Sequence, residues 1–310
     1  MQLKLIEGLH KLGKELIYIE KMTKDTFFIT IVKKVLCSKK SKYQLIEIIE
    51  TESFGKMLHL NCKLQASTAD EWIYHEALVH PALLTHPNPQ KIVIIGGGDG
   101  GALREVLKHP TVSRVTLVEL DPEVIDIVMK FMPEIPQNAF HDERVNLMFM
   151  DGRKFIKETN EQFDIIIADV TDPWGQSSFL YTKEFYELVA SKLNDHGMFV
   201  TQSLSINMYF EQFAKIFNAM SKAFKFVCAY SAFVPSFSDE WAFIMGSNDI
   251  NPLTIDVEKI KKRYYERNLK TKFYDPERHK ELITLPTHIE KKLSKFSEVS
   301  TDISPVSVQC

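Results

Sequence analysis

Cysteine is scarce in this sequence, and its placement excludes several classes of site. No two of the cysteines form a C-x-x-C pair, and they are scattered along 310 residues as Cys37, Cys62, Cys228 and Cys310. A zinc site or a disulfide framework needs closer and more regular spacing. We therefore expect reduced, structural thiols in a cytoplasmic protein, and no bound metal.

Long apolar runs and a marked excess of one charge are also missing. No run reaches the roughly 18 apolar residues that span a bilayer, and residues 1–8 lack the small-residue cleavage site of a secretory signal. The formal net charge of -3 provides no electrostatic footprint for nucleic acid. We therefore predict a cytoplasmic protein with neither a membrane nor a nucleic acid as partner.

Glycine is sparse overall, yet five of the 12 glycines lie within the six positions 96–101. Four β-branched residues precede them at 92–95, and a helical pattern follows. Gly96, Gly98 and Gly101 have the G-x-G-x-x-G spacing at which a strand turns into a helix beside a bound nucleotide. With a strand before it and a helix after it, this stretch is the candidate nucleoside-binding loop.

Asp99 is the unusual residue of this loop. A carboxylate here would repel the pyrophosphate that a helix N-terminus otherwise attracts. The loop therefore predicts a nucleoside that carries a cationic substituent.

Beyond the loop, apolar strands alternate with amphipathic helices, which is typical of a parallel sheet covered on both faces. The predicted strands span 92–95, 114–120, 145–150, 163–168 and 198–202, and the predicted helices span 102–109, 122–132, 153–159 and 182–193. A hairpin at 224–234 and 241–247 would add one edge. We predict an α/β fold with a Rossmann-like, doubly wound, mostly parallel sheet of the class I methyltransferase type.

The N-terminal part has a different pattern, with short β-branched and aromatic segments joined by polar turns. Four strands are expected, at 15–20, 26–35, 43–49 and 54–60. So few strands need a further surface to be stable, either elsewhere in the chain or in a second subunit. A homodimer or homotetramer formed through this small antiparallel β domain is the expected assembly.

These patterns divide the chain into three regions. Residues 1–64 form the N-terminal β domain. Residues 65–297 form the Rossmann-like catalytic domain, which opens with a helix over 65–84 that is capped near Ser67 and Thr68. The tail 298–310 is rich in Ser, Thr and Val and is expected to be loose.

Acidic residues follow the successive strands of the predicted sheet. In an open α/β sheet, ligands bind at the carboxyl ends of the strands near the topological switch point. The acids that should converge there are Asp99, Glu119, Asp151, Asp169 and Asp172. Each of them alone could cap a helix or lie in a solvated loop, but together they predict an acidic pocket for cationic ligands.

Two of these acids have positions that suggest contact with a nucleoside. Glu119 lies 18 residues after Gly101, where an acid can accept hydrogen bonds from ribose hydroxyls. Asp151 can meet an adenine amino group, or it can cap the next helix. Tyr74 and His75, on the helix before the glycine loop, are as consistent with core residues as with site residues.

These residues closely resemble the motifs of the polyamine aminopropyltransferases, the spermidine synthase family, over about residues 15–285. The resemblance rests on Gln65, Asp70-Glu-Trp-Ile-Tyr-His-Glu, His86-Pro-Asn-Pro, Gly96-Gly-Gly-Asp-Gly-Gly with Leu103-Arg-Glu, Glu119, Asp151-Gly and Asp169-x-x-Asp172-Pro. Members of this family transfer an aminopropyl group from decarboxylated S-adenosylmethionine to an amine and release methylthioadenosine. The resemblance implies a co-substrate rather than a cofactor, and a small cationic amine as the second substrate.

The resemblance also implies roles for individual residues. Asp169 would be the catalytic residue, which orients the amine or takes its proton, and Asp99 would hold the aminopropyl ammonium. The donor would be bound by Gln44, Gln65, Gly96, Gly98, Asp99, Glu119, Asp151 and Gly152. The acceptor would be bound by Tyr74, His75, Asp169, Asp172, Phe237 and Trp241.

The acceptor region departs from the usual spermidine synthase pattern. Ser203-Leu204-Ser205 stands where a glutamate is frequent, and Phe237 replaces the usual tyrosine. Val234-Pro-Ser-Phe-Ser-Asp-Glu-Trp and Leu180-Tyr-Thr-Lys are more similar to thermospermine synthases. Putrescine or a related diamine is the expected acceptor, giving spermidine. Spermidine is the alternative acceptor, giving thermospermine or spermine.

Two other classes of protein share parts of this pattern. An S-adenosylmethionine-dependent methyltransferase has the same fold, but Asp99 would then face the carboxylate of the donor. A non-catalytic polyamine-binding protein would not need both Asp169 and Asp172.

Overall fold

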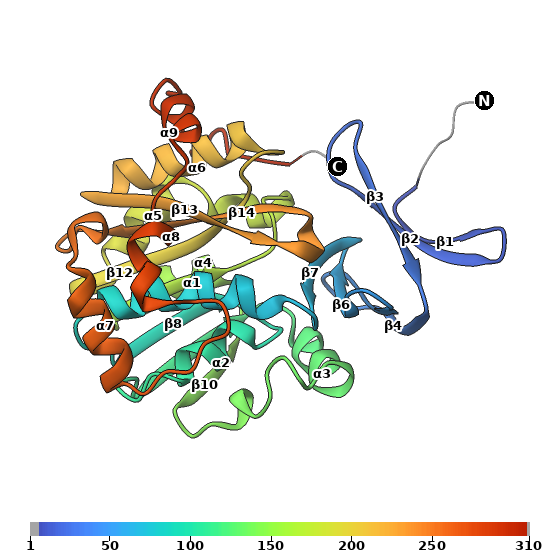
Figure 1. Cartoon of the computed structure of the whole chain (residues 1–310), viewed down its shortest axis with the longest axis horizontal. Coiled ribbons are helices and arrows are strands. Elements are labelled where there is room, and N and C mark those ends of the chain that lie inside the picture. The colour runs from blue at the N-terminus through green and yellow to red at the C-terminus, as the bar shows by residue number, and fades with distance from the viewer. Residues whose placement is uncertain (1–5, 309–310) are drawn as a thin grey trace.

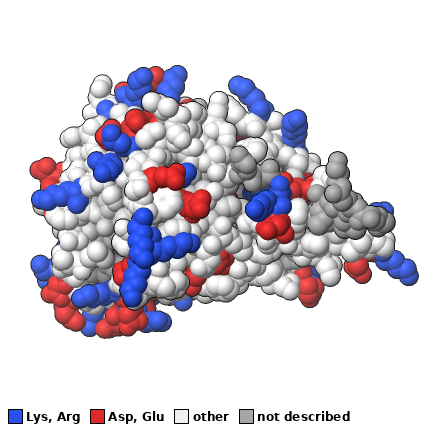
Figure 2. All heavy atoms as spheres, turned by 90° about the horizontal axis from the view of Figure 1, so that it is seen from above, with Lys and Arg blue, Asp and Glu red and all other residues white. Residues whose placement is uncertain are grey.

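The structure is a computed structural model that describes residues 6–308. It consists of a large α/β part and a smaller N-terminal β part that lies to one side of it (Figure 1). Within the described residues, no helix is long and apolar enough to cross a membrane. On the face seen in Figure 2, basic and acidic side chains are intermixed over the surface.

The N-terminal part contains seven strands in two antiparallel sheets, rather than the four strands expected. The first sheet has the order β1-β2-β3, with β1 Gly8–Leu12, β2 Glu15–Lys21 and β3 Phe27–Val32. The second has the order β4-β5-β6-β7, with β4 Lys34–Lys40, β5 Leu45–Thr51, β6 Gly55–Leu60 and β7 Lys63–Ser67. The predicted strand 26–35 is divided between β3 and β4, which lie in different sheets.

The large part is built on one seven-stranded sheet with the order β10-β9-β8-β11-β12-β14-β13. The parallel strands are β8 Lys91–Gly96, β9 Arg114–Glu119, β10 Val145–Phe149, β11 Phe163–Asp169 and β12 Leu193–Ser205. The hairpin of β13 Phe226–Val234 and β14 Asp239–Ser247 completes one edge, with β14 antiparallel to β12. The predicted fold class is therefore confirmed.

Helices cover both faces of this sheet, because alternate residues of the central strands are apolar on both sides. Ile92 and Ile94 of β8 pack with α1 Glu71–Thr85 and α2 Gly101–Leu107. Val93 and Ile95 face the other way, toward a core that the second group of helices completes: α4 Gly152–Glu158, α5 Lys183–Ala190 and α6 Phe210–Ala223.

Helix α3, Pro122–Phe131, joins the two parts of the molecule. Its apolar face, with Val124 and Val128, packs on Ile46 and Leu58 of the second N-terminal sheet. The last helices are α7 Val257–Glu266, α8 His279–Leu282 and α9 Thr287–Leu293. Because the small sheet is covered by α3, the N-terminal strands form one wall of the space at the carboxyl ends of the large sheet.

Helix α1 begins later than expected. It starts at Glu71 with Asp70 at the N-cap position, and not near Ser67 and Thr68. The Asp70 carboxylate is used elsewhere: it accepts hydrogen bonds from the backbone N–H and the hydroxyl of Ser236, at 2.6 and 2.8 Å. Asp70 therefore ties the start of α1 to the turn between β13 and β14.

Several residues of the tail 298–308 pack against the fold, although its composition predicts a loose segment. Val306 and Val308 are 3% exposed, and Ser300 is fully buried. Asp302 forms an ion pair with Arg153 at 2.6 Å and accepts a hydrogen bond from the Thr182 hydroxyl at 2.7 Å. Alternating valines and one partly exposed ion pair hold this segment, whereas residues 309–310 lie outside the described residues.

Candidate active site

A cavity of about 600 Å³ lies at the carboxyl ends of β8, β9 and β11. Strand β8 lies between β9 and β11, so the chain reverses its direction of winding there, and this is where open α/β sheets bind ligands. A volume of this size is typical of small-molecule pockets. The predicted site residues that line it are Gln44, Gln65, Tyr74, Gly96, Gly98, Asp99, Glu119, Asp151, Gly152, Asp169, Asp172, Phe237 and Trp241.

The glycine loop closes the base of the cavity by joining the ends of β8 and β11. The backbone N–H of Gly97 donates to the carbonyl oxygen of Asp169 at 2.8 Å. Gly96 has φ of +78°, and a Cβ there would lie 2.2 Å from the same carbonyl oxygen. At Gly98, a Cβ would lie 2.9 Å from Oε2 of Glu119. Glycine is therefore needed at both positions for the close approach of these strand ends.

Asp169 stands at the end of β11 with one carboxylate oxygen in a hydrogen bond and the other unpaired. The Tyr74 hydroxyl donates to Oδ1 at 2.8 Å, and Oδ2 is buried without a hydrogen-bond partner among the described residues. Burial, together with the charge of Asp99, raises the pKa of Asp169 to about 6. An unpaired carboxylate oxygen with a raised pKa is suited to accept a proton near neutral pH.

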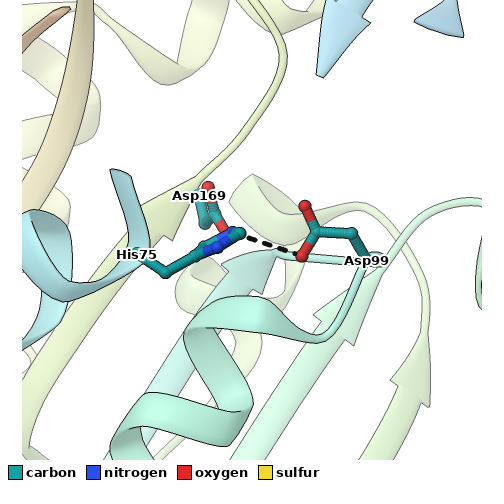
Figure 3. A group of neighbouring side chains, drawn as sticks. All are labelled: His75, Asp99 and Asp169. Carbon is teal, nitrogen blue, oxygen red and sulfur yellow. Dashed lines mark ion pairs between the residues drawn. The ribbon is translucent and has the colours of Figure 1, made fainter. Parts of the chain in front are cut away.

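Asp99 lies beside Asp169, and His75 lies next to both on the side away from the cavity. Figure 3 shows the His75 ring pointing from α1 toward Asp99, with Nε2 at 3.4 Å from Oδ1 of Asp99. On its other side, Nδ1 is 2.7 Å from a carboxylate oxygen of Glu71. Burial alone would lower the pKa of His75, but the Asp99 and Glu71 carboxylates raise it well above its usual range. The two flanking carboxylates favour the imidazolium form of His75, and its proximity lowers the pKa of Asp99 against the effect of burial.

The position of His75 differs from the predicted contact with the acceptor. Its side chain is 1% exposed and does not line the cavity. It can lie beneath the loop because Gly101 has no side chain: a Cβ there would lie 2.2 Å from the imidazole ring. His75 thus contacts Asp99 from within the fold and acts on the site through that carboxylate.

The oxygens of Asp99 and Asp169 and a nitrogen of His75 all lie within 4.8 Å of one another, a spacing that could also hold a metal ion. A metal would need a lone pair from the imidazole. Both ring nitrogens of His75 face carboxylates, which favours the protonated ring that has no lone pair to offer. The two aspartates therefore fit a ligand ammonium better than a metal.

A buried chain of charged groups supports His75, and the sequence analysis did not find it. Arg104 donates to both oxygens of Glu71, at 2.8 and 2.9 Å, and to Glu105 at 2.8 Å. Glu105 in turn lies 2.9 Å from a ring nitrogen of His80. Bidentate pairs of this kind fix geometry as well as charge, so Glu71 holds the His75 ring in one orientation. The signals for this network were the Asp70-Glu-Trp-Ile-Tyr-His-Glu and Leu103-Arg-Glu motifs.

The donor side of the cavity is formed by side chains that also have structural bonds. Glu119 accepts a hydrogen bond from the backbone N–H of Asp121 at 2.9 Å, and burial raises its pKa to about 7. Asp151 caps α4 through the N–H of Lys154 at 2.7 Å while lining the cavity. Gln44 donates to Asp121 at 3.1 Å. Asp151 is therefore the predicted helix cap, and its contact with an adenine amino group stays a prediction.

The opposite side is aromatic and contains two further groups that sequence reasoning missed. Phe237 packs against Trp241, with ring centroids 4.6 Å apart, and against Tyr74 at 6.0 Å. The indole N–H of Trp241 donates to Gln202 at 3.2 Å, and Gln202 also lines the cavity. Burial raises the pKa of Asp172 to about 6. The other missed group, Glu20, lies just beyond Asp172.

Comparison with known proteins agrees with this geometry. Residues 71–256 match the spermine/spermidine synthase domain, and residues 17–68 match the spermidine synthase tetramerisation domain. The chain belongs to the spermidine synthase family. The assignment to the polyamine aminopropyltransferases made from the sequence is thereby confirmed, whereas the similarity to thermospermine synthases stays a prediction.

Individual members of the family are similar over nearly their whole length. The polyamine aminopropyltransferase of Korarchaeum cryptofilum is 44% identical over 97% of this chain and 94% of its own. That of Sulfurisphaera tokodaii is 43% identical over 94% and 97%. A solved spermidine synthase in complex with the transition state analogue AdoDATO has a TM-score of 0.83 and 31% identity, covering 96% of this chain and 100% of that one.

The Tyr74–Asp169 hydrogen bond gives a prediction about pH dependence. Asp169, with a pKa of about 6, is ionised above that pH and loses its ability to take a proton as the pH falls through it. Tyr74→Phe removes a hydrogen bond that favours the ionised form, so the acid limb of kcat/KM should move to higher pH. At pH 6 the activity should fall roughly threefold, since such a bond is worth about 1 kcal/mol and its loss raises the pKa of Asp169 by about 0.7.

The control is Tyr186→Phe. The Tyr186 hydroxyl is buried without a hydrogen-bond partner among the described residues, so its removal should leave the pH profile in place. An unchanged acid limb in Tyr74→Phe would contradict the role given to this bond.

Proposed function

We propose that the protein transfers the aminopropyl group of decarboxylated S-adenosylmethionine to putrescine, forming spermidine and methylthioadenosine. The observation that carries this proposal is the adjacency of Asp99 and Asp169, two partly buried carboxylates that each place an oxygen within 4.8 Å of the other beside the glycine loop. One carboxylate suits the ammonium of the donor, and the other suits the attacking amine.

In this proposal Asp169 prepares the amine for attack. An alkylamine with a pKa near 10 arrives protonated and has no lone pair to give. The carboxylate of Asp169, whose Oδ2 has no hydrogen-bond partner among the described residues, takes one proton from it. The freed lone pair forms a bond to the aminopropyl carbon, the bond from that carbon to sulfur breaks, and its electron pair neutralises the sulfonium. Holding both substrates in line lowers the barrier further.

Asp99 supports the choice of donor. Its ionised carboxylate, kept so by His75, attracts the free ammonium of the decarboxylated donor. The extra carboxylate of S-adenosylmethionine would meet the same negative charge at close range, which disfavours a methyltransferase reaction. Glu119 and Asp151 are proposed to bind the ribose and the adenine, and Gln44 and Gln65 to line the donor side.

The acceptor side supports a diamine first and spermidine second. Tyr74, Phe237 and Trp241 form an apolar channel for methylene groups, and Asp172 offers a carboxylate beyond Asp169. The alternative product, thermospermine or spermine, rests on the residues around Val234 and Leu180 and remains the second candidate. Turnover with putrescine, agmatine, cadaverine and spermidine separates these acceptors.

Asp169→Asn tests the proposed base. The amide keeps an oxygen for the Tyr74 hydroxyl but cannot take a proton, so kcat should fall by a factor of roughly 10² to 10⁴. Because burial raises the pKa of Asp169, the ionised side chain opposes folding at neutral pH, and the variant should melt no lower than the wild type. Methylthioadenosine binding, measured by calorimetry, serves as the control for an intact donor site. Wild-type turnover by this variant would contradict the proposal.

We also propose that subunits associate through the first N-terminal sheet. Ile29 and Ile31 lie two residues apart on one face of β3 and are 53% and 63% exposed. Apolar side chains on an exposed sheet face are typical of an interface. The match of residues 17–68 to a tetramerisation domain supports a homo-oligomer, and a homodimer or homotetramer is the proposed form.

The double variant Ile29→Asp with Ile31→Asp should therefore have a smaller mass in light scattering than the wild type, because charge is buried poorly in an interface. Leu253→Asp is the matched control: Leu253 is 46% exposed in the catalytic part, and its replacement should leave the mass unchanged. Equal masses for the double variant and the wild type would place the interface elsewhere.

A further inference from the structure

The cavity continues past Asp172 into a small space of about 20 Å³. Asp172 and Lys63 line both spaces, so the small one is the far end of the large one. The N-terminal part closes this end, because Glu20 and Lys21 of β2 and Phe28 of β3 line only the small space. A volume of this size holds about one water molecule, so a further propyl chain does not fit into it.

Lys63, on strand β7, carries its ammonium to the junction of the two spaces. Its Nζ lies 2.8 Å from a carboxylate oxygen of Glu7 and also donates to the backbone carbonyl oxygen of Lys21. Glu7 lines the large space and Lys21 the small one. Because the Lys63 side chain is only 16% exposed, its position is determined by these contacts rather than by solvent.

The Lys63 ammonium balances the acids at the far end. Burial raises the pKa of Glu20 to about 7 and that of Asp172 to about 6, and in both cases Lys63 is the main group that lowers it. The residues that line the small space include two acids, Glu20 and Asp172, and two lysines, Lys21 and Lys63. The far end therefore provides no excess of negative charge to attract a further cation.

The wall that carries Asp172 is also held in place. The backbone N–H of Val308 donates to the carbonyl oxygen of Pro173, which follows Asp172, at 2.9 Å. On the other side of Asp172, the Gln202 amide donates to the carbonyl oxygen of Val170 at 2.9 Å. Packed groups therefore bound the acceptor space on both sides of the junction.

These contacts set a limit on the length of the acceptor. With its reacting amine at Asp169, a short diamine can end beside Asp172 within the large space. The longer chain of spermidine would have to continue into the small space, where its last ammonium would meet the ammonium of Lys63. Like charges repel strongly at such close range when little water separates them.

We propose that Lys63 determines acceptor specificity: its ammonium closes the far end of the acceptor space, so that the enzyme uses short diamines and excludes longer polyamines such as spermidine. This inference rests on the proposed function, in which the reacting amine lies at Asp169. It decides between the two acceptors that the sequence left open. Glu7 and the carbonyl oxygen of Lys21 hold the ammonium in position, so the N-terminal part sets the length of the acceptor.

The test compares spermidine with 1,4-diaminobutane as acceptors. In the wild type, kcat/KM should be lower for spermidine. Lys63→Met keeps a long side chain and removes its charge, so the ratio of kcat/KM for spermidine to that for the diamine should rise roughly tenfold or more. Lys63→Arg retains the charge and should keep the wild-type ratio. Lys63→Gln is a second neutral variant, with the same expected rise, should Lys63→Met fail to fold.

Lys33→Met is the matched control. Lys33 also lies in the N-terminal part and pairs with a glutamate, Glu52, at 3.4 Å, but it is 59% exposed and lies outside both spaces. Its replacement should leave the ratio unchanged. Methylthioadenosine affinity, measured by calorimetry, should be the same in Lys63→Met as in the wild type, which shows that the donor side is intact.

The outcomes separate this inference from the proposed function. If no amine reacts with the decarboxylated donor in the wild type, the proposed function fails and the role of Lys63 fails with it. If the wild type uses spermidine as well as it uses the diamine, the function stands and the role of Lys63 is wrong. The same conclusion follows if the neutral variants change kcat/KM for both amines by the same factor, or for neither.

Discussion

Buried negative charge is the constraint on which the rest of the structure depends. Asp169 and Asp172 have pKa values raised to about 6, and Glu119 and Glu20 to about 7, in each case mainly by burial. Carboxylates that are withdrawn from water and have no cationic partner oppose folding when they are ionised. A cationic substrate is such a partner. Its binding therefore stabilises carboxylates whose ionised form destabilises the protein without substrate.

The fold shifts the pKa values of two neighbouring carboxylates in opposite directions. Asp99 has the imidazolium of His75 behind it and stays ionised, whereas Asp169 has a tyrosine hydroxyl and a negative neighbour, and its pKa is raised. Different environments for paired acids are how enzymes assign different roles to the same side chain. The His75 charge depends in turn on Glu71 and Arg104, so the difference is built into α1 and α2 rather than into the cavity surface.

Local pattern was enough to predict the centre of this site but not its ends. The apolar strands, the glycine loop and the acids after each strand are set by period and by strand direction, so their convergence follows from the sequence. The number of N-terminal strands was predicted too low, in part because apolar and polar residues alternate weakly in β4, which also contains several lysines. The packing of Val306 depends on a surface that is distant in the chain. The position of the His75 ring requires that residue 101 has no side chain, and the periodicity of the sequence does not predict this close approach.

The parts of the cavity that the sequence predicts are the ends of the central strands, and the parts that it does not predict come from segments outside the central sheet. The reacting groups lie at the ends of β8 and β11, where one sheet fixes both strands through the Gly97–Asp169 hydrogen bond. The far end of the acceptor space is bounded by Glu20 from β2, and its loop is held by Val308 near the end of the chain. These outer segments are not strands of the central sheet, so the proposed selection of the acceptor is structurally separate from the proposed chemistry at the ends of β8 and β11.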